Sequence, residues 1–308
     1  EITDTKMHGI KALRECRDVV IDNCDIISPE FGWSVNGIQM KHSTAESEYF
    51  MMRVTDLNFS DVQFKGKYSF QYIKNAVFDN CVLDTKDAFW HSENVTVKNS
   101  VVKGEYLAWY SDGLTLINCK IIGTQPLCYC KNLTLINCEM VDTDLCFERS
   151  EVQAILTSSV DSIKNPLSGW IQVTEVGEII MDVAEATGKV MISDVDAQTE
   201  EFQKTVSENK EFVKEFIQNE IPQIQVASFY DTCFLRLNFV RMIGNGMEAV
   251  SYIKEKTGVY FSYGKQNGQG GNEFLRINTA CSRSVLERSL QQLKAGITAY
   301  EKFCVERC

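Results

Sequence analysis

A seven-residue pattern returns every nineteen residues along the first half of the chain, and this repeat limits the folds open to that half. Residues 94–100 read NVTVKNS, residues 113–119 read GLTLINC and residues 132–138 read NLTLINC. The same interval leads back to residues 75–81 and to residues 19–24. Such a period indicates one supersecondary unit that is too small to bury its own apolar face and therefore stacks on copies of itself.

Two positions of the repeat are apolar in every copy, with one mixed residue between them. The two columns are Val19, Ile38, Leu57, Ala76, Val95, Leu114, Leu133 and Val152, and Ile21, Met40, Phe59, Phe78, Val97, Leu116, Leu135 and Ala154. This alternation favours strands with one buried face. Because parallel crossovers are right-handed, we predict an all-β right-handed parallel β-helix, a solenoid of 19-residue coils, over residues 1–182.

A polar column follows each strand and predicts the turn. It consists of Asn23, His42, Asp61, Asn80, Asn99, Asn118 and Asn137. Amide side chains in such a column suit a turn in which they form hydrogen bonds from one coil to the next. Small residues come directly after them, so we expect Cys119 and Cys138 to be neighbours in adjacent coils.

The pattern changes after residue 182, where residues 183–196 suggest a linker. Residues 197–303 then suggest a small α+β domain. Apolar residues at helical spacing predict a helix through residues 202–217 that stops before Pro222. Further helices are predicted at 247–256 and 284–301, with strands at 224–229, 234–239, 259–261 and 274–278.

Composition excludes some classes of function. The formal net charge of −11 argues against a nucleic-acid binder, whose affinity would come from neutralising phosphates. No apolar run reaches the length of a membrane span, so no membrane partner is expected. We interpret the twelve cysteines as mostly small buried thiols, kept reduced in a cytoplasmic protein. The chain begins inside a full coil, so we expect it to be a fragment.

The first half resembles a bacterial right-handed parallel β-helix family of unknown function. The matching phrases are residues 66–72, 83–91, 103–111 and 123–130, and the resemblance covers residues 1–182. It implies a fold but no particular chemistry.

The second half resembles the C-terminal subdomain of pyridoxal-phosphate enzymes of the cystathionine β-lyase type, within the class I/II aminotransferase fold. Residues 234–239, the Gly-rich run 268–273 and residues 274–283 carry this resemblance. In that family the arginine of the last strand holds the substrate α-carboxylate, so the resemblance implies that Arg276 binds a small carboxylate. The large domain with its Schiff-base lysine has no counterpart in this chain. No cofactor is therefore expected, and pyridoxal phosphate would bind only if a missing domain supplied the lysine.

Aromatic residues recur at one phase of the coil and suggest a ligand surface. One column holds Trp33, Trp90 and Trp109, and the next holds Tyr72, His91, Tyr110 and Tyr129. Neighbouring residues of a strand point to opposite sides, so we expect only one of the two columns at the surface. Stacked aromatic surfaces suit a carbohydrate or a partner protein. The alternative is an aromatic ladder packed inside the coil.

Four carboxylates lie near each other in coil phase: Asp84, Asp87, Glu105 and Asp112. They suggest acid–base chemistry of the kind found in pectin-degrading β-helices, although solvated turn residues are the commoner explanation of such a group. Cys128 and Cys130 are too few for a metal site, and no catalytic residue or metal ligand is predicted.

Three functions follow from these patterns. The first is a non-enzymatic binding or scaffolding β-helix protein that carries an orphan aminotransferase-like subdomain. The second is part of a pyridoxal-phosphate-dependent C–S lyase or aminotransferase whose cofactor domain is missing from this chain. The third is a carbohydrate-active β-helix.

Overall fold

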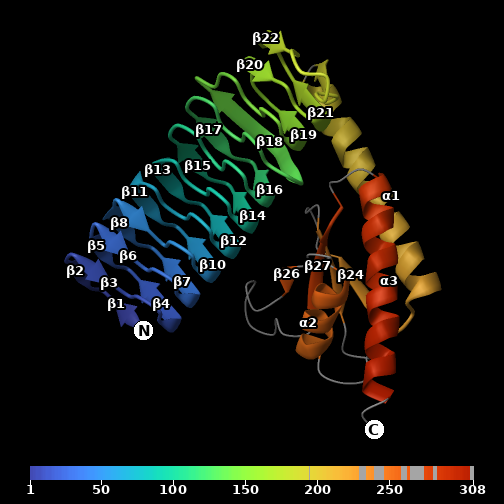
Figure 1. Ribbon diagram of the computed structural model, residues 1–308, viewed down its shortest axis with the longest axis horizontal. Helices are drawn as coiled ribbons and strands as arrows, with labels where there is room; N and C mark the ends of the chain where they lie inside the picture. The colour runs from blue at the N-terminus through green and yellow to red at the C-terminus, as the bar shows by residue number, and fades with distance from the viewer. Residues whose placement is uncertain are drawn as a thin grey trace. The chain divides into compact units, whose positions relative to one another are not determined.

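The computed structural model describes residues 1–193, 195–228, 234–238, 246–257, 262–263, 274–279 and 283–305. The chain divides into two compact units, Glu1–Thr199 and Glu200–Cys308. The first unit is a parallel β-solenoid of about ten turns. Its coils run from blue to yellow-green in Figure 1.

The solenoid is built from parallel ladders to which each coil adds one strand. The first sheet contains β1 (Ile2–Thr3), β4 (Arg17–Asp22), β7 (Asn36–Lys41), β10 (Thr55–Ser60), β12 (Lys74–Asp79), β14 (Glu93–Lys98), β16 (Asp112–Ile117), β18 (Leu133–Val141), β19 (Glu151–Leu156), β21 (Ser168–Val173) and β23 (Lys189–Ile192). The second contains β2 (Lys6–His8), β5 (Asp25–Ile27), β8 (Thr44–Ser47), β11 (Gln63–Lys67), β13 (Val82–Lys86), β15 (Val101–Lys103), β17 (Lys120–Ile122) and the end of β18. Two short ladders complete the unit: β3 (Lys11–Ala12), β6 (Glu30–Phe31) and β9 (Tyr49–Phe50), and β20 (Val160–Lys164) with β22 (Val176–Ile180).

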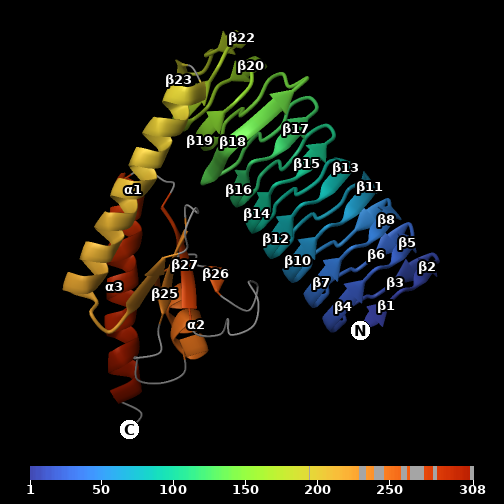
Figure 2. The same ribbon diagram turned by 180° about the vertical axis from the view of Figure 1, so that it is seen from behind.

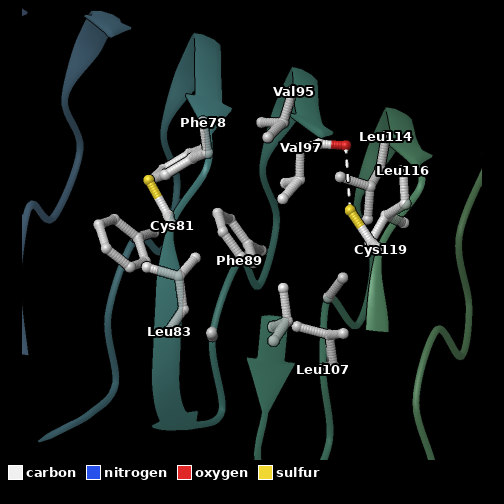
Figure 3. Close-up of a cluster of buried hydrophobic side chains, with 14 of the residues drawn as sticks. Phe78, Cys81, Leu83, Phe89, Val95, Val97, Leu107, Leu114, Leu116 and Cys119 are labelled. Atoms are coloured by element: carbon white, nitrogen blue, oxygen red, sulfur yellow. Dashed lines mark hydrogen bonds between the residues drawn. The ribbon is translucent and has the colours of Figure 1, made fainter. Parts of the chain in front are cut away.

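The register of the strands confirms the predicted parallel solenoid. Ala76 pairs with Val95 and Val95 with Leu114, so residues nineteen apart lie side by side. Both predicted apolar columns point inward, and Phe78 and Leu116 are almost completely buried. Figure 3 shows these side chains together with Phe89, which enters the same core from a turn.

The predicted amide ladder is also present. Asn118 donates a hydrogen bond from Nδ2 to Oδ1 of Asn99 at 3.3 Å and accepts one from Asn137 at 3.0 Å. All three residues have left-handed backbone conformations, with φ between 51° and 55°. Asparagine tolerates this conformation better than most residues do, so the turn selects the same residue type in coil after coil.

The solenoid continues beyond its predicted end. Strand β23 lies inside residues 183–196, which the sequence suggested as a linker, and it pairs with β21 through Trp170 and Lys189. The prediction of a linker is therefore wrong at residues 189–192. The offset between paired residues also falls, from nineteen for Leu133 and Val152 to seventeen for Val152 and Gly169. This shortening hides the repeat from a fixed-period search.

The second unit contains an antiparallel sheet and helices. Its elements, with α1 beginning just before it, are α1 (Val195–Glu220), β24 (Gln225–Ser228), β25 (Phe234–Asn238), α2 (Gly246–Thr257), β26 (Ser262–Tyr263), β27 (Phe274–Asn278) and α3 (Arg283–Val305). The strand order is β24-β25-β27-β26, and Figure 2 shows this sheet among the helices of the unit. The sheet and the helices share one apolar core, to which helix residues such as Val213, Ile253 and Leu290 contribute. These elements confirm the predicted helices and three of the four predicted strands. The fourth prediction, 259–261, lies outside the described residues.

No helix in the described part of the chain combines the length and the apolar character that crossing a bilayer requires.

Candidate functional site

The predicted aromatic residues lie on a tight turn that each coil makes between its second-sheet strand and the next strand of the first sheet. In this turn Phe89 and His91 both have left-handed backbones, with φ of 61° and 53°. Phe89 is buried, Trp90 is half-buried, His91 is exposed and Ser92 is buried again. The expectation that only one aromatic column reaches the surface is therefore wrong. That expectation assumed that neighbouring side chains alternate as they do in a strand. In the left-handed turn, two consecutive side chains point outward.

Tyr72, His91, Tyr110 and Tyr129 form a continuous stack, one ring per coil. Successive ring centroids lie 4.9, 5.0 and 4.8 Å apart, and successive ring planes differ by 9°, 9° and 14°. The relative exposures of Tyr72 and Tyr110 are 42% and 47%. Because each inner ring has neighbours on both faces, the stack presents ring edges to solvent. Within the described residues, the tyrosine hydroxyls and the His91 ring nitrogens have no hydrogen-bond partner.

Trp90 and Trp109 stack beside this column. Their ring centroids are 5.4 Å apart and their planes differ by 4°. Trp109 also meets the rings of Tyr110 and Tyr129 edge to face, with centroid distances of 6.4 and 5.5 Å. We call the six residues Tyr72, Trp90, His91, Trp109, Tyr110 and Tyr129 the aromatic face. The structure brings together six of the seven aromatic residues that the sequence proposed, whereas Trp33 lies apart from them and meets Tyr49 edge to face.

The tryptophans also have a structural role. The indole Nε1 of Trp90 donates to the carbonyl oxygen of Tyr106 at 2.7 Å, and that of Trp109 donates to Gln125 at 2.8 Å. Gln71 occupies the corresponding place one coil earlier and donates from Nε2 to the carbonyl of Asp87. A side-chain donor at this position therefore satisfies a backbone carbonyl in the next coil, and this structural role does not depend on a ligand.

Charged residues lie at the two ends of the aromatic column. The Arg53 guanidinium lies over the Tyr72 ring, 5.2 Å from its centroid. At the other end, Tyr129 donates its backbone N–H to the carbonyl of Glu148, whose carboxylate pairs with Lys164 at 3.2 Å. Partial burial, followed by the nearby Glu148 charge, raises the pKa of Tyr129. The sequence analysis missed Arg53 and Glu148, although the nineteen-residue interval from Tyr72 and Tyr129 points to both.

The four carboxylates proposed for acid–base chemistry have other partners or surroundings. Glu105 pairs with Lys86 at 2.7 Å, and Asp84 pairs with Lys103 at 3.5 Å, each across neighbouring coils. Asp112 accepts a hydrogen bond from Asn132 at 2.8 Å. Asp87 is buried, and desolvation raises its pKa. The hydrogen bond from Lys86 to Glu105 raises the pKa of the lysine, as expected for a cross-coil ion pair.

Metal binding finds no support in the described ranges, where no group of three or more His, Cys, Asp or Glu side chains is arranged to hold an ion. Cys128 and Cys130 are buried, and burial raises their pKa values to about 12 and about 11. Thiols with such pKa values are protonated near neutral pH, whereas metal ligation requires the thiolate.

Arg276 lies in β27, where its backbone pairs with that of Arg236 on one side and Ser262 on the other. Its side chain and the Gly-rich run 268–273 lie outside the described residues. The carboxylate-binding role that the resemblance implies for Arg276 therefore stays a prediction.

Comparison with known proteins gives little information on activity. No curated protein matches the chain. One solved structure, titled "Crystal structure of PLP-bound putative aminotransferase from Clostridium difficile 630 crystallized with magnesium formate", matches at 29% identity with a TM-score of 0.32. The match covers 33% of this chain and only 26% of that chain. A likeness this short and loose does not confirm the predicted resemblance to pyridoxal-phosphate enzymes.

The first unit gives a clearer result. A family model described as "Protein of unknown function (DUF3737)" matches residues 1–193, which cover the solenoid from β1 to β23. The chain belongs to the DUF3737 family of proteins of unknown function.

Proposed function

We propose that this protein is a non-enzymatic binding or scaffolding protein and that the aromatic face is its ligand surface. One observation carries the proposal: the edges of four stacked rings face solvent, and their polar atoms have no partner among the described residues. Amphipathic rings of this kind, with an apolar body and a polar tip, are common where proteins bind other molecules.

The surrounding solenoid supports this assignment by contrast. The turn amides form hydrogen bonds along their ladder, as Asn118 does with Asn99 and Asn137. Lysines of neighbouring coils pair with Asp84 and Glu105. The amide ladder and the ion pairs use their polar groups to hold neighbouring coils together, whereas the polar groups of the aromatic column are available to a ligand.

The same ion pairs favour binding over catalysis. A general acid and a nucleophile or base must face one substrate, with pKa values moved apart by their surroundings. Asp84 and Glu105 each face a lysine instead, so their carboxylates resemble the other cross-coil pairs of the solenoid, such as Lys98 with Asp79 at 2.8 Å.

The test uses the intrinsic fluorescence of Trp90 and Trp109. The purified chain would be titrated with a panel of soluble neutral and acidic polysaccharides and unstructured peptides. We expect at least one probe to change the emission saturably, and the changes Tyr110→Ala and His91→Ala to weaken its binding at least tenfold. Lys103→Ala, which changes an exposed residue of β15, serves as the control and should leave binding unchanged.

Circular dichroism would establish that each variant keeps its strand content. A panel without any binder, or a binder equally unaffected by Tyr110→Ala and His91→Ala, would contradict the proposal.

A further inference from the structure

The aromatic column runs along the solenoid axis, because each of its rings comes from the same position of a successive coil. The ring spacing, 4.8 to 5.0 Å, matches the spacing of about 4.8 Å between neighbouring strands. Four rings therefore form a straight row roughly 14 Å long, three coil steps of this size. A compact ligand would meet one or two of these rings, whereas an extended chain can meet all four.

The row of rings offers hydrogen-bonding groups to a ligand at a regular interval. The faces of His91 and Tyr110 are covered by their neighbours, so a ligand cannot stack on them. What remains is one hydroxyl or ring nitrogen per coil. A matching ligand must therefore offer a hydrogen-bonding group once per repeat along its length.

The strip beside the row is apolar. Trp90 and Trp109 are half-buried there, with their indole N–H groups already bonded to backbone carbonyls. They offer carbon edges and no free donor. A ligand that lies over both strips must be amphipathic across its width, with polar groups on one side and C–H groups on the other.

Charge narrows the class of ligand further. No acidic or basic side chain other than His91 stands in the column between Arg53 and Glu148. The row therefore contains no ring of cations that would neutralise an anionic polymer, and the chain as a whole carries a net charge of −11. An uncharged chain fits these surroundings better than an acidic one does.

We infer that the aromatic face binds a linear, uncharged polysaccharide that lies along the solenoid axis with one sugar unit per coil. Sugar units carry hydroxyl groups at their edges and C–H groups on their faces, and they repeat regularly along the chain. This inference rests on the proposed function and specifies the ligand of the same surface.

The experiment measures affinity as a function of ligand length. Isothermal titration calorimetry would be run with neutral β-linked xylo-oligosaccharides and cello-oligosaccharides, from the disaccharide to the hexasaccharide. Each added unit should lower Kd about three- to tenfold, as one further net hydrogen bond would, up to the tetrasaccharide. Longer chains should bind with nearly constant affinity, because the row has four rings.

A conservative variant tests the contact directly. Tyr110→Phe keeps the ring in the stack and removes one hydroxyl, so it should raise the Kd of the tetrasaccharide about three- to tenfold. Tyr252→Phe makes the same change in α2 of the second unit and should have no effect. An unchanged Kd in Tyr110→Phe would overturn the inference even if the protein binds the sugar.

The other outcomes separate this inference from the proposed function. Binding that does not depend on length, or that is tighter for oligogalacturonides than for neutral chains, would overturn the inference. Binding of peptides alone, sensitive to Tyr110→Ala, would overturn it as well while leaving the aromatic face as a binding surface for a protein. The absence of any binding would contradict both.

Discussion

The indole Nε1 of Trp90 donates a hydrogen bond, 2.7 Å long, to the backbone carbonyl of Tyr106 in the next coil. Tyr106 has a left-handed backbone, with φ of 57°. Such a turn does not place every carbonyl in a ladder, and a half-buried carbonyl without a donor costs free energy. Trp90 therefore links two coils in two separate ways, through this hydrogen bond and through the stacking of its ring on Trp109.

Replacing Trp90 by phenylalanine should lower the free energy of unfolding by about 1–2 kcal/mol, because the carbonyl of Tyr106 loses its donor while an aromatic ring remains. Urea denaturation monitored by circular dichroism measures the change. Trp90→Gln is the matched control, since Gln71 makes the equivalent bond in this fold. A Phe variant more stable than the Gln variant would show that ring stacking outweighs the hydrogen bond.

Asn118→Ala should destabilise the solenoid by about 1–3 kcal/mol. The change removes one donor and one acceptor from the amide ladder, and alanine tolerates the left-handed backbone of this turn less well than asparagine does. Asn118→Gly loses the same hydrogen bonds but accepts the backbone conformation without strain, so it should be the more stable of the two variants. Equal stability of both would assign the whole effect to the ladder.

Stability should fall at alkaline pH because of the buried thiols. Burial raises the pKa of Cys130 from an ordinary 9.0 to about 11, so above pH 9 the unfolded chain releases a proton that the folded chain keeps. The contribution is fully present below pH 9 and is lost as the pH rises through 11, on the order of 3 kcal/mol in total.

Lysines and tyrosines titrate in the same range, so the comparison is made against Cys130→Ala. The difference in unfolding free energy between the wild-type protein and this variant should shrink between pH 8 and pH 11. A difference that stays constant would mean that the thiol titrates alike in both states.

Titration of the chain with pyridoxal phosphate should produce no saturable absorbance of an internal aldimine, and borohydride should fix no adduct on a single lysine. The reason is that no residue of this sequence matches the Schiff-base lysine of the enzymes that residues 234–239 and 274–283 resemble. A single reducible lysine adduct would contradict this expectation and would make Arg276 a candidate for substrate binding.

The solenoid could be predicted from the sequence because parallel, in-register pairing gives equivalent residues of every coil the same surroundings. Val95 and Leu114 are both apolar because both point into one core, and Asn99 and Asn118 recur because both occupy the same left-handed turn. Where the offset between coils shortens after Val152, equivalent residues no longer fall at one interval. The strand at residues 189–192 was missed for that reason.

The aromatic face was predicted residue by residue, but its geometry was not. Period-two reasoning placed Trp90 and His91 on opposite sides of a strand, and nothing local in the sequence signals that Phe89 and His91 adopt left-handed conformations without glycine. Inter-coil hydrogen bonds hold that conformation in place: the backbone N–H of Phe89 donates to the carbonyl of Ser69, and that of His91 donates to the carbonyl of Trp109. Such tertiary control of a turn is invisible to local pattern rules.

Because equal coils stack in register, the solenoid can gain or lose length only by complete coils. Removing residues 94–112 would join Glu93 to Gly113 and leave every column continuous, since Gly113 occupies the position that Asn94 held. Removing one residue fewer would shift each following side chain out of its column. Duplication or loss of complete coils can therefore lengthen or shorten the row of rings without a new fold. The length of ligand that the surface can contact is then set by the number of coils that carry a ring.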